Sequence, residues 1–266
     1  MLSKTLTTET WNDELPRMKI RMGEVIIYTS AIDLEDGHKG GLGQIRRELD
    51  MMEFARSCGV RVPRVYSYHR EGDVETCVME YVEGTMLEEI KDEEVISTVK
   101  GQVREYVGMM ETVTHNEVDF VLSNNLSPCQ TFANSKAFYR YLLRGIETLH
   151  RRYPDGPKPS YDVEAAVAAL PDEPIVFSHG DLYNSNNVIV GLDGTLALID
   201  FECAGYHPLH VARWLAGIKD NDPVSRLVDA ICTTSKAVSH GEEEKYCAGM
   251  PSLEDQLKRM NAYVAI

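Results

Sequence analysis

The chain has 266 residues, 43% of them hydrophobic and 26% charged, a composition typical of a soluble globular protein with a sizeable core. Lys and Arg number 27 against 42 Asp and Glu, and the net charge of −15 argues against a nucleic-acid partner, because phosphate backbones bind basic surfaces. No apolar run approaches the ~20 residues of a membrane helix, and the polar N-terminus lacks the apolar core of a secretory signal.

The first part of the chain favours strands and one helix. A β-branched run at 24–29 predicts a strand, and the Gly- and Asp-rich stretch 30–43 predicts a loop. Residues 44–58 carry apolar side chains at helical spacing. Two apolar runs at 61–69 and 74–82 flank the turn REGD and predict a β-hairpin.

After Gly84 the pattern becomes mostly helical. Valine recurs at every fourth position between residues 95 and 107, which predicts a helix over 93–113. Further helices are predicted at 135–153, 161–170, 211–219, 223–238 and 252–264. We therefore expect a small strand-rich part over residues 1–83 and a larger helical part over 84–266.

The stretch FSHGDLYNSNNVIVG, residues 177–191, interrupts the helical part with a polar loop between two apolar runs. Asp181 follows the first run, and Asp193-Gly194 is a hairpin dipeptide that leads to a second run ending at Asp200. Carboxylates and carboxamides at strand ends are hard oxygen ligands suited to Mg²⁺. A carboxylate that does not bind the metal could accept the proton of a hydroxyl nucleophile. Together these roles are those that phosphoryl transfer requires.

The motif HGDLYNSN…LIDFECAG resembles the catalytic loop and metal-binding segment of the aminoglycoside phosphotransferase family, and closely its fungal branch. CVMEYVEGTMLEEI at 77–90 resembles the hinge of that family, and RELDMMEFARSCGVRVPRVYSY resembles its N-lobe helix and following strand. The resemblance implies an α+β, protein-kinase-like fold with two lobes. We expect a truncated, strand-rich N-lobe and a larger helical C-lobe that carries the catalytic loop.

The resemblance also implies roles for the residues of the loop. Asp181 would be the catalytic base that orients the acceptor hydroxyl, and His179 would support the loop conformation. Asn186 and Asp200 would hold Mg²⁺ against the phosphates of ATP. Asn187 directly precedes the apolar run, as the family's Asn usually does, so one inserted residue would exchange the roles of the two asparagines.

A nucleotide site is implied on the N-lobe side. Backbone groups near Glu80 and Val82 would hold the adenine edge, and Glu48 would pair with a phosphate-binding lysine on the strand before its helix. That strand contains no lysine: Ile27 stands at the matching position, or Tyr28 if the register slips. The residues before it contain no glycine-rich hairpin, although Lys19, Lys39 or an arginine could supply the missing charge.

The sequence therefore favours an ATP- and Mg²⁺-dependent phosphotransferase acting on a hydroxyl of a small molecule. An acidic protein is compatible with a cationic or neutral substrate. Two alternatives remain open: a kinase-like protein that binds a metabolite or protein without transferring phosphate, and a cleft reused for acid–base chemistry without ATP. The six cysteines form no CxxC pair, which favours reduced thiols in a cytoplasmic protein.

Polar residues beyond the loop have simpler interpretations. His207 and His210 are spaced like metal ligands, but no third ligand lies near them in the sequence, so loop structure is the favoured reading. Asp220 and Asp222 precede a predicted helix, and we interpret them first as helix-start residues and second as contacts for a cationic substrate.

Overall fold

The computed structural model describes residues 8–11, 17–31, 44–72, 74–120, 130–152, 162–183, 185–218, 220 and 222–239. The chain forms two compact units, described one at a time. The first unit comprises residues 1–112, 120–130 and 179–205, and the second comprises 113–119, 131–178 and 206–266. Both units are discontinuous in sequence, so the lobe boundary expected near Gly84 stays a prediction.

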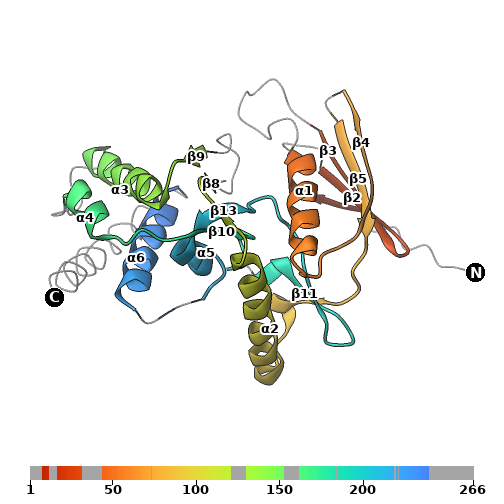
Figure 1. The fold of residues 1–266 in the computed structure, drawn as a ribbon. Helices are drawn as coiled ribbons and strands as arrows, with labels where there is room; N and C mark the ends of the chain where they lie inside the picture. Colours follow the sequence, from red (N-terminus) through yellow and green to blue (C-terminus); the bar gives the residue numbers. More distant parts are fainter. Residues whose placement is uncertain are drawn as a thin grey trace, which may run out of the picture. The chain divides into compact units, whose positions relative to one another are not determined.

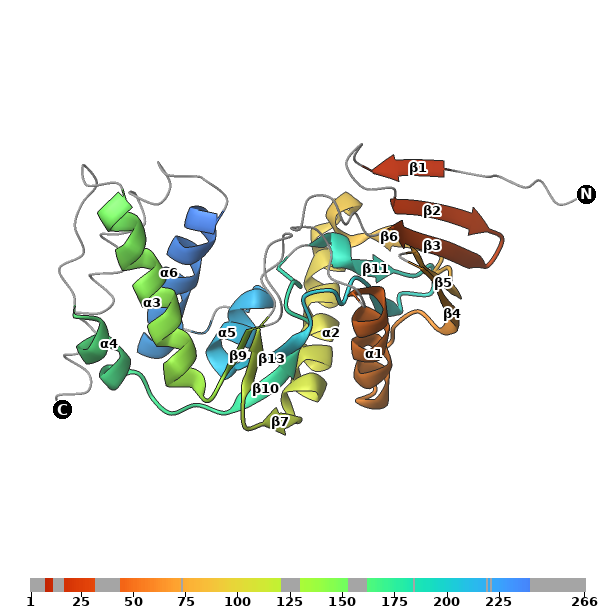
Figure 2. The same ribbon diagram turned by 90° about the horizontal axis from the view of Figure 1, so that it is seen from above.

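The first unit contains a five-stranded antiparallel sheet with the order β1-β2-β3-β5-β4 (Figure 2). Its strands are β1 (Thr8–Trp11), β2 (Arg17–Met22), β3 (Val25–Ala31), β4 (Val65–Glu71) and β5 (Val74–Glu80). The β3 strand and the β4–β5 hairpin agree with the sequence prediction. The strands β1 and β2 were not predicted, because they are rich in polar and charged residues.

Helix α1 (Gln44–Ser57) packs beside this sheet (Figure 1). Its apolar stripe, predicted from the spacing, is buried at Ile45, Leu49, Met52 and Ala55. The helix begins against the buried carboxylate of Glu75 on β5, which accepts a hydrogen bond from the backbone nitrogen of Ile45 at 3.3 Å. A carboxylate at a helix N-terminus interacts favourably with the helix dipole, so α1 is anchored to the sheet at its first turn.

The remaining described part of the first unit contains a long helix and a three-stranded sheet. Helix α2 (Glu93–Glu111) is capped by Asp92, and its stripe is buried at Val99, Val103 and Val107, whereas Val95 in the first turn is exposed. The small sheet has the order β12-β11-β6. Its strands are β6 (Thr85–Met86), β11 (Val188–Val190) and β12 (Leu196–Leu198), and the short 3-10 helices η1 (Leu87–Glu89) and η2 (Ser185–Asn187) adjoin it.

In its described residues the second unit combines four helices with a sheet of the order β7-β10-β13-β8-β9. The helices among the described residues are α3 (Ser135–Arg152), α4 (Val163–Ala169), α5 (Leu209–Leu215) and α6 (Pro223–Ser239). The strands are β7 (Thr114–His115), β8 (Val118–Phe120), β9 (Gln130–Phe132), β10 (Ile175–Ser178) and β13 (Gly205–Pro208). Helices α3 and α6 lie side by side in Figures 1 and 2.

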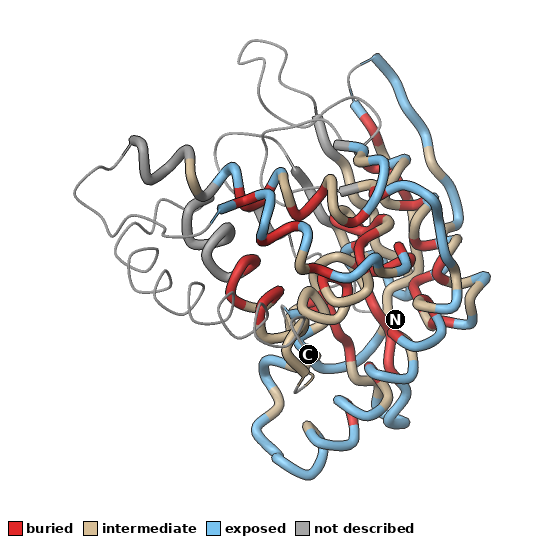
Figure 3. Tube along the Cα trace, turned by 60° about the vertical axis from the view of Figure 1, so that its left-hand side comes forward, coloured by how far each residue is buried: buried red, intermediate tan, exposed pale blue. Residues whose placement is uncertain are grey.

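Each unit has its own buried side chains, and buried positions recur between exposed ones along the helices (Figure 3). The α+β class expected from the sequence is confirmed by this mixture of sheets and helices. The helix predicted at 252–264 and most of the loop predicted at 30–43 lie outside the described residues. Of the helices that are described, none combines the length and apolar character needed to cross a membrane.

Candidate active site

The loop that leaves β10 begins with a buried histidine. His179 is 1% exposed, its ring centroid lies 4.3 Å from that of Phe201, and its Nε2 donates to the carbonyl oxygen of Ile199 at 2.9 Å. Burial lowers the pKa of His179 to about 4, although the hydrogen bond to Ile199 and the nearby charge of Asp200 oppose the shift. The imidazole is therefore neutral at physiological pH and ties the loop to the segment that contains Asp200.

The next residue, Gly180, lets this loop touch that segment closely. Its φ of 84° is in the left-handed region, and a Cβ placed there would collide with the backbone carbonyl of Cys203. A glycine meets both demands, because it tolerates positive φ and has no side chain. The His179-Gly180-Asp181 motif thus requires this glycine for backbone packing.

Asp181 lies beside Asn187 rather than Asn186. The buried carboxamide of Asn187 donates from Nδ2 to the backbone oxygen of Asp181 at 2.9 Å and to its Oδ2 at 3.2 Å. The backbone oxygen of Asn187 accepts from the nitrogen of Ile199 at 3.0 Å. Asn187 therefore links Asp181 to the strand end that leads into Asp200.

Asn186 is directed elsewhere. It is half-buried, and with its carboxamide turned so that Nδ2 donates, it bonds the carboxylate of Glu88, with 2.7 Å to Oε1. Glu88 belongs to η1, which lies beside η2 in the same unit. The two asparagines left open by the sequence thus have different neighbours, and Asn187 is the one that joins the Asp181 cluster.

Asp200 follows β12 in an unusual backbone conformation. Among the described residues it is the non-glycine residue with positive φ, at 65°. Its side chain is exposed, while the preceding Ile199 is held by His179 and Asn187 through both of its backbone polar groups. Left-handed backbone at a non-glycine residue costs roughly 1–2 kcal/mol, so the surrounding contacts must hold it in place.

Two residues of this cluster could hold Mg²⁺. Asp200 offers a carboxylate, and Asn187 keeps its carboxamide oxygen available because its nitrogen donates to Asp181. Hard oxygen donors with room for water are what Mg²⁺ prefers. Within the described ranges no group of three or more His, Cys, Asp or Glu gathers as a metal site, so a metal held here would need the carboxamide oxygen as a ligand.

Glu80 lies at the end of β5 in an ion pair with Arg61. The Nη1 of Arg61 is 3.1 Å from Oε2 of Glu80, its Nη2 contacts Oε1, and Arg64 donates its backbone nitrogen to Oε2 at 2.9 Å. Hydrogen bonding to Arg61 lowers the pKa of the Glu80 carboxyl. The backbone nitrogen of Glu80 also donates to the oxygen of Arg64 at 2.8 Å, and half-buried Val82 follows two residues later.

The sheet register decides which residue of β3 faces α1. Glu75 and Cys77 on β5 are buried, and Glu75 contacts the start of α1, so this face of β5 lies toward the helix. Tyr28 pairs with Cys77, whereas Ile27 pairs with Val78 on the opposite face. Tyr28 therefore occupies the helix-facing position at which the family resemblance implies a lysine.

Glu48 is half-buried on α1 and lies next to Arg47 in the sequence. Lys19 pairs with Tyr28 in the backbone register of β2 and β3, and Lys39 lies outside the described residues. The predicted site residues thus fall into two sets within the first unit. His179, Asp181, Asn186 with its alternative Asn187, and Asp200 lie on or next to the polar loop, and Glu48, Glu80 and Val82 lie on the helix and the sheet side.

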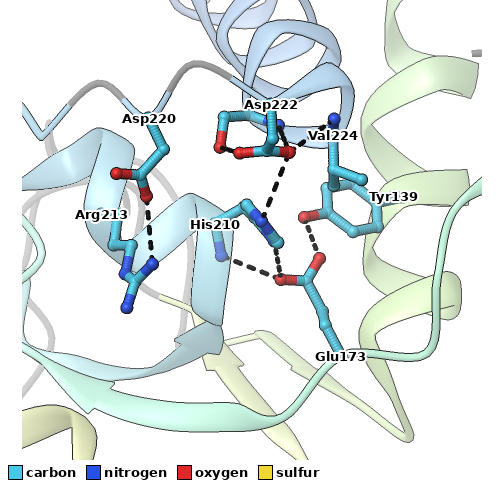
Figure 4. A network of polar contacts seen from close by, with 8 residues as sticks. Tyr139, Glu173, His210, Arg213, Asp220, Asp222 and Val224 are labelled. Carbon is cyan, nitrogen blue, oxygen red and sulfur yellow. Dashed lines mark hydrogen bonds and ion pairs between the residues drawn. The ribbon is translucent and has the colours of Figure 1, made fainter.

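In the second unit, His207, His210 and Asp222 have structural partners. His207 is buried, with Nδ1 2.8 Å from the hydroxyl of Ser178, whereas His210 contacts Glu173, so the two histidines serve different partners. Asp222 accepts from the backbone nitrogens of Val224 and Ser225 at the start of α6, as a helix-start residue (Figure 4).

Sequence reasoning missed two arginines of the first unit. Arg61 joins Glu80 by its side chain and accepts from the nitrogen of Leu198 by its backbone oxygen, at 2.9 Å. Arg47 donates to the backbone oxygens of Glu202 and Ala204. Neither lies in a recognisable motif, because their partners are 19 to 157 positions away in the chain.

Three solved structures show the same fold. An apo form of a thermostable mutant of aminoglycoside phosphotransferase APH(4)-Ia gives a TM-score of 0.58 at 12% identity, covering 96% of this chain and 94% of that chain. The ternary complex of such a mutant with ADP and hygromycin B gives 0.56 at 12% identity, covering 96% and 93%. The streptomycin–ATP–APH(2")-IIa ternary complex gives 0.53 at 11% identity, covering 96% and 91%.

These likenesses confirm the protein-kinase-like fold predicted from the sequence. Among curated proteins, no relative matches the sequence. The family described as the phosphotransferase enzyme family, APH, matches residues 35–214, which is about two thirds of the 266-residue chain and includes the whole Asp181–Asp200 loop. The chain therefore belongs to the APH phosphotransferase enzyme family.

Proposed function

We propose that the protein transfers the γ-phosphoryl group of ATP to a hydroxyl of a small molecule, with Mg²⁺ as the metal. The observation that carries this proposal is the cluster in which buried Asn187 holds Asp181 and connects it to the strand end of Asp200. Membership of the phosphotransferase enzyme family supports it, as do solved relatives of the same fold in complex with ADP or ATP.

In the proposed reaction Asp181 orients the acceptor hydroxyl and takes up its proton as the new oxygen–phosphorus bond forms. The bond between the γ-phosphorus and its bridging oxygen breaks, and ADP leaves. Asp181 suits this role because both its backbone oxygen and its Oδ2 accept from Asn187, which fixes the carboxylate in one orientation.

Asp200 and the carboxamide oxygen of Asn187 would hold the metal. Mg²⁺ bound there would neutralise phosphate charge during transfer. We assign the ligand role to Asn187 in place of Asn186, because Asn186 is turned toward Glu88. His179 supports the loop without taking part in chemistry, since it is buried and neutral.

The adenine would bind to the backbone after β5. The nitrogen of Glu80 is already bonded to Arg64, so we assign the adenine contact to groups nearer Val82, with Tyr81 covered by Arg21, whose Cζ lies 3.6 Å from the ring centroid. Glu48 on α1 stays a candidate for pairing with a cationic group that binds the phosphates of ATP.

For the acceptor we propose a cationic molecule that carries hydroxyl groups. The net charge of −15 favours a cation, and the solved relatives were crystallised with hygromycin B and with streptomycin. A cytoplasmic location and membership of the fungal branch stay predictions from the sequence.

A second candidate is a kinase-like protein that does not transfer phosphate. Strand β3, all of whose residues are described, carries no lysine, and Tyr28 occupies the position facing α1. The acid–base alternative has less support, because a histidine with a pKa of about 4 that is bonded to Ile199 is a poor proton donor near neutral pH.

The test measures ADP formation with Mg²⁺-ATP and a panel of cationic and neutral polyhydroxylated small molecules. Asp181→Asn should lower transfer roughly 10²–10⁴-fold while the thermal shift caused by Mg²⁺-ATP persists. Asp200→Ala should abolish the Mg²⁺-dependent part of that shift. Asn187→Ala should raise the half-saturating Mg²⁺ concentration about 10–100-fold, and Asn186→Ala should change it less.

A matched control is Asp172→Asn, which removes a carboxylate that is 86% exposed in the second unit and should leave transfer unchanged. Binding of Mg²⁺-ATP without transfer to any acceptor would favour the non-catalytic candidate. Transfer that survives both Asp181→Asn and Asp200→Ala would show that the assigned residues are wrong.

A further inference from the structure

The segment that follows Asp200 folds into a compact turn against the catalytic loop. Phe201 is fully buried beside the ring of His179, and the nitrogen of Ala204 donates to the oxygen of Phe201 at 3.0 Å. The carbonyl of Cys203 lies against Gly180, where no side chain would fit. We name residues 201–204 the Asp200 turn.

Arg47 of α1 donates two hydrogen bonds to this turn. Its Nη2 donates to the backbone oxygen of Ala204 at 2.8 Å, and its Nη1 donates to the backbone oxygen of Glu202 at 3.3 Å. All three residues belong to the first unit. A planar guanidinium with donors in a fixed fork holds two acceptors in one relative geometry, which a flexible ammonium does not.

The helix that carries Arg47 is itself held firmly. Buried Ile45, Leu49 and Met52 pack it on the sheet, and Glu75 accepts from the nitrogen of Ile45 at its first turn. Glu75 is fixed in turn by the hydroxyl of Tyr68, which donates to Oε1 at 2.6 Å. A displacement of α1 would therefore pull on the Asp200 turn through the arginine.

The backbone of Asp200 needs to be fixed by contacts on both its N-terminal and its C-terminal side. Its left-handed backbone, with φ of 65°, is unfavourable for a non-glycine residue and persists where neighbouring contacts impose it. On the N-terminal side Ile199 is fixed by His179 and Asn187. On the C-terminal side the turn is fixed by its packing and by Arg47.

We propose that Arg47 is a positioning residue, which connects α1 to the Asp200 turn and thereby holds the Asp200 carboxylate in the geometry needed for metal binding. The arginine acts through backbone carbonyls, not through the phosphates. That Arg47 holds the turn follows from the hydrogen bonds alone. That it affects metal binding and transfer rests on the proposed phosphotransferase function.

The test compares Arg47→Met and Arg47→Lys with the control Arg46→Met. Arg46 is the adjacent residue on the same helix, 59% exposed, and pairs with Asp50 at the surface. Hydrogen exchange of the amides of residues 199–205 reports on the turn without any ligand. We expect faster exchange there in Arg47→Met, an intermediate rate in Arg47→Lys, and the wild-type rate in Arg46→Met.

The second measurement is the Mg²⁺ dependence of transfer. The half-saturating Mg²⁺ concentration should rise about 10–100-fold in Arg47→Met, as for partners that orient metal ligands, and less in Arg47→Lys. A merely structural role would lower the thermal midpoint without moving this concentration. Should Arg47→Met fail to fold, Arg47→Lys, which keeps the charge and the aliphatic stem, is compared with Arg46→Met in both measurements.

Exchange at residues 199–205 that is the same in Arg47→Met and Arg46→Met would overturn the positioning role. Faster exchange with an unchanged Mg²⁺ requirement would overturn its catalytic consequence. If wild-type protein transfers no phosphate, the proposed function fails, and the exchange comparison still decides whether Arg47 holds the turn.

Discussion

Gly180 and Gly194 have the same backbone preference in very different surroundings. Both have positive φ, 84° and 78°, but a Cβ at Gly180 would meet the Cys203 backbone, whereas a Cβ at Gly194 would meet nothing within 4 Å. Substitution at Gly194 therefore carries only the free-energy cost of the backbone conformation, whereas substitution at Gly180 carries in addition the cost of close packing.

Gly180→Ala should therefore destabilise the protein by at least about 3 kcal/mol, since strain and overpacking add. Gly194→Ala, at the tip of the β11–β12 hairpin, should cost about 1 kcal/mol, because only the left-handed backbone is penalised. Urea unfolding of the two variants measures the difference. Equal losses would mean that the loop backbone moves to accept a methyl group.

The depressed pKa of His179 makes the free energy of unfolding depend on pH under acidic conditions. Its pKa is about 4 in the folded protein against 6.5 for an unperturbed histidine, so between these values the unfolded state binds more protons. The free energy of unfolding should fall as the pH drops from about 6.5 to 4, by up to roughly 3 kcal/mol. Removing the titrating ring in His179→Gln should flatten this part of the stability curve, as followed by urea unfolding at each pH.

His210 provides the control for that measurement. Hydrogen bonding to Glu173 raises the pKa of His210, so the stability it contributes is complete below pH 6.5 and is lost as the pH rises through its folded pKa. His210→Gln should therefore leave the slope between pH 4 and 6.5 unchanged. An unchanged slope in His179→Gln would show that the acid sensitivity has another source.

At the scale of elements, α3 and α5 are joined through Glu173, in the connection between α4 and β10. This carboxylate accepts from the hydroxyl of Tyr139 on α3 at 2.5 Å and from the backbone nitrogen and Nδ1 of His210 on α5, both at 2.8 Å (Figure 4). Burial, with the neighbouring Glu173, raises the pKa of Tyr139, so its hydroxyl stays a donor. Helices α3 and α5 thus share one buried acceptor.

Tyr139→Phe should lower the free energy of unfolding by about 1 kcal/mol, because a buried hydrogen bond is lost while the ring is retained. Tyr141→Phe is the matched control on the same helix. Its side chain is 39% exposed and its ring contact with Phe132 would be kept, so we expect almost no change. Chemical denaturation measures both, and equal effects would mean that the Glu173 bond adds nothing.

At the scale of the whole molecule, the residues assigned to nucleotide and metal lie in one of the two compact units. His179 to Asp200 and the segment around Glu80 belong to the first unit, whereas α3 and α6 belong to the second. A ligand that binds the native state slows exchange most at the amides of its own site.

Mg²⁺-ATP should therefore slow hydrogen exchange in residues 74–83 and 179–205 more than in α3 and α6. Exchange with and without nucleotide, followed by peptide, makes the measurement. Mg²⁺ alone should protect residues 179–205 but not 74–83. Protection confined to the second unit would place the nucleotide elsewhere and contradict the assigned site.

Much of this protein was predictable from local pattern. Helix α1 followed from the spacing of Ile45, Leu49 and Met52, and the β11–β12 hairpin from Asp193-Gly194, because side-chain periodicity and turn chemistry are local properties. Strands β1 and β2 were missed, because their polar residues give no alternation that separates a strand from a loop.

The sequence by itself determined the phosphotransferase family and its fold, because the motif around His179, Asp181 and Asp200 resembles that family. Tertiary structure decided which residues lie together. Asn187 was distinguished from Asn186, Tyr28 from Ile27, and Arg47 from Arg46 by contacts between residues far apart in the chain. Neighbouring positions carry similar side chains, and only the register of strands and the phase of helices tells which of them faces the site.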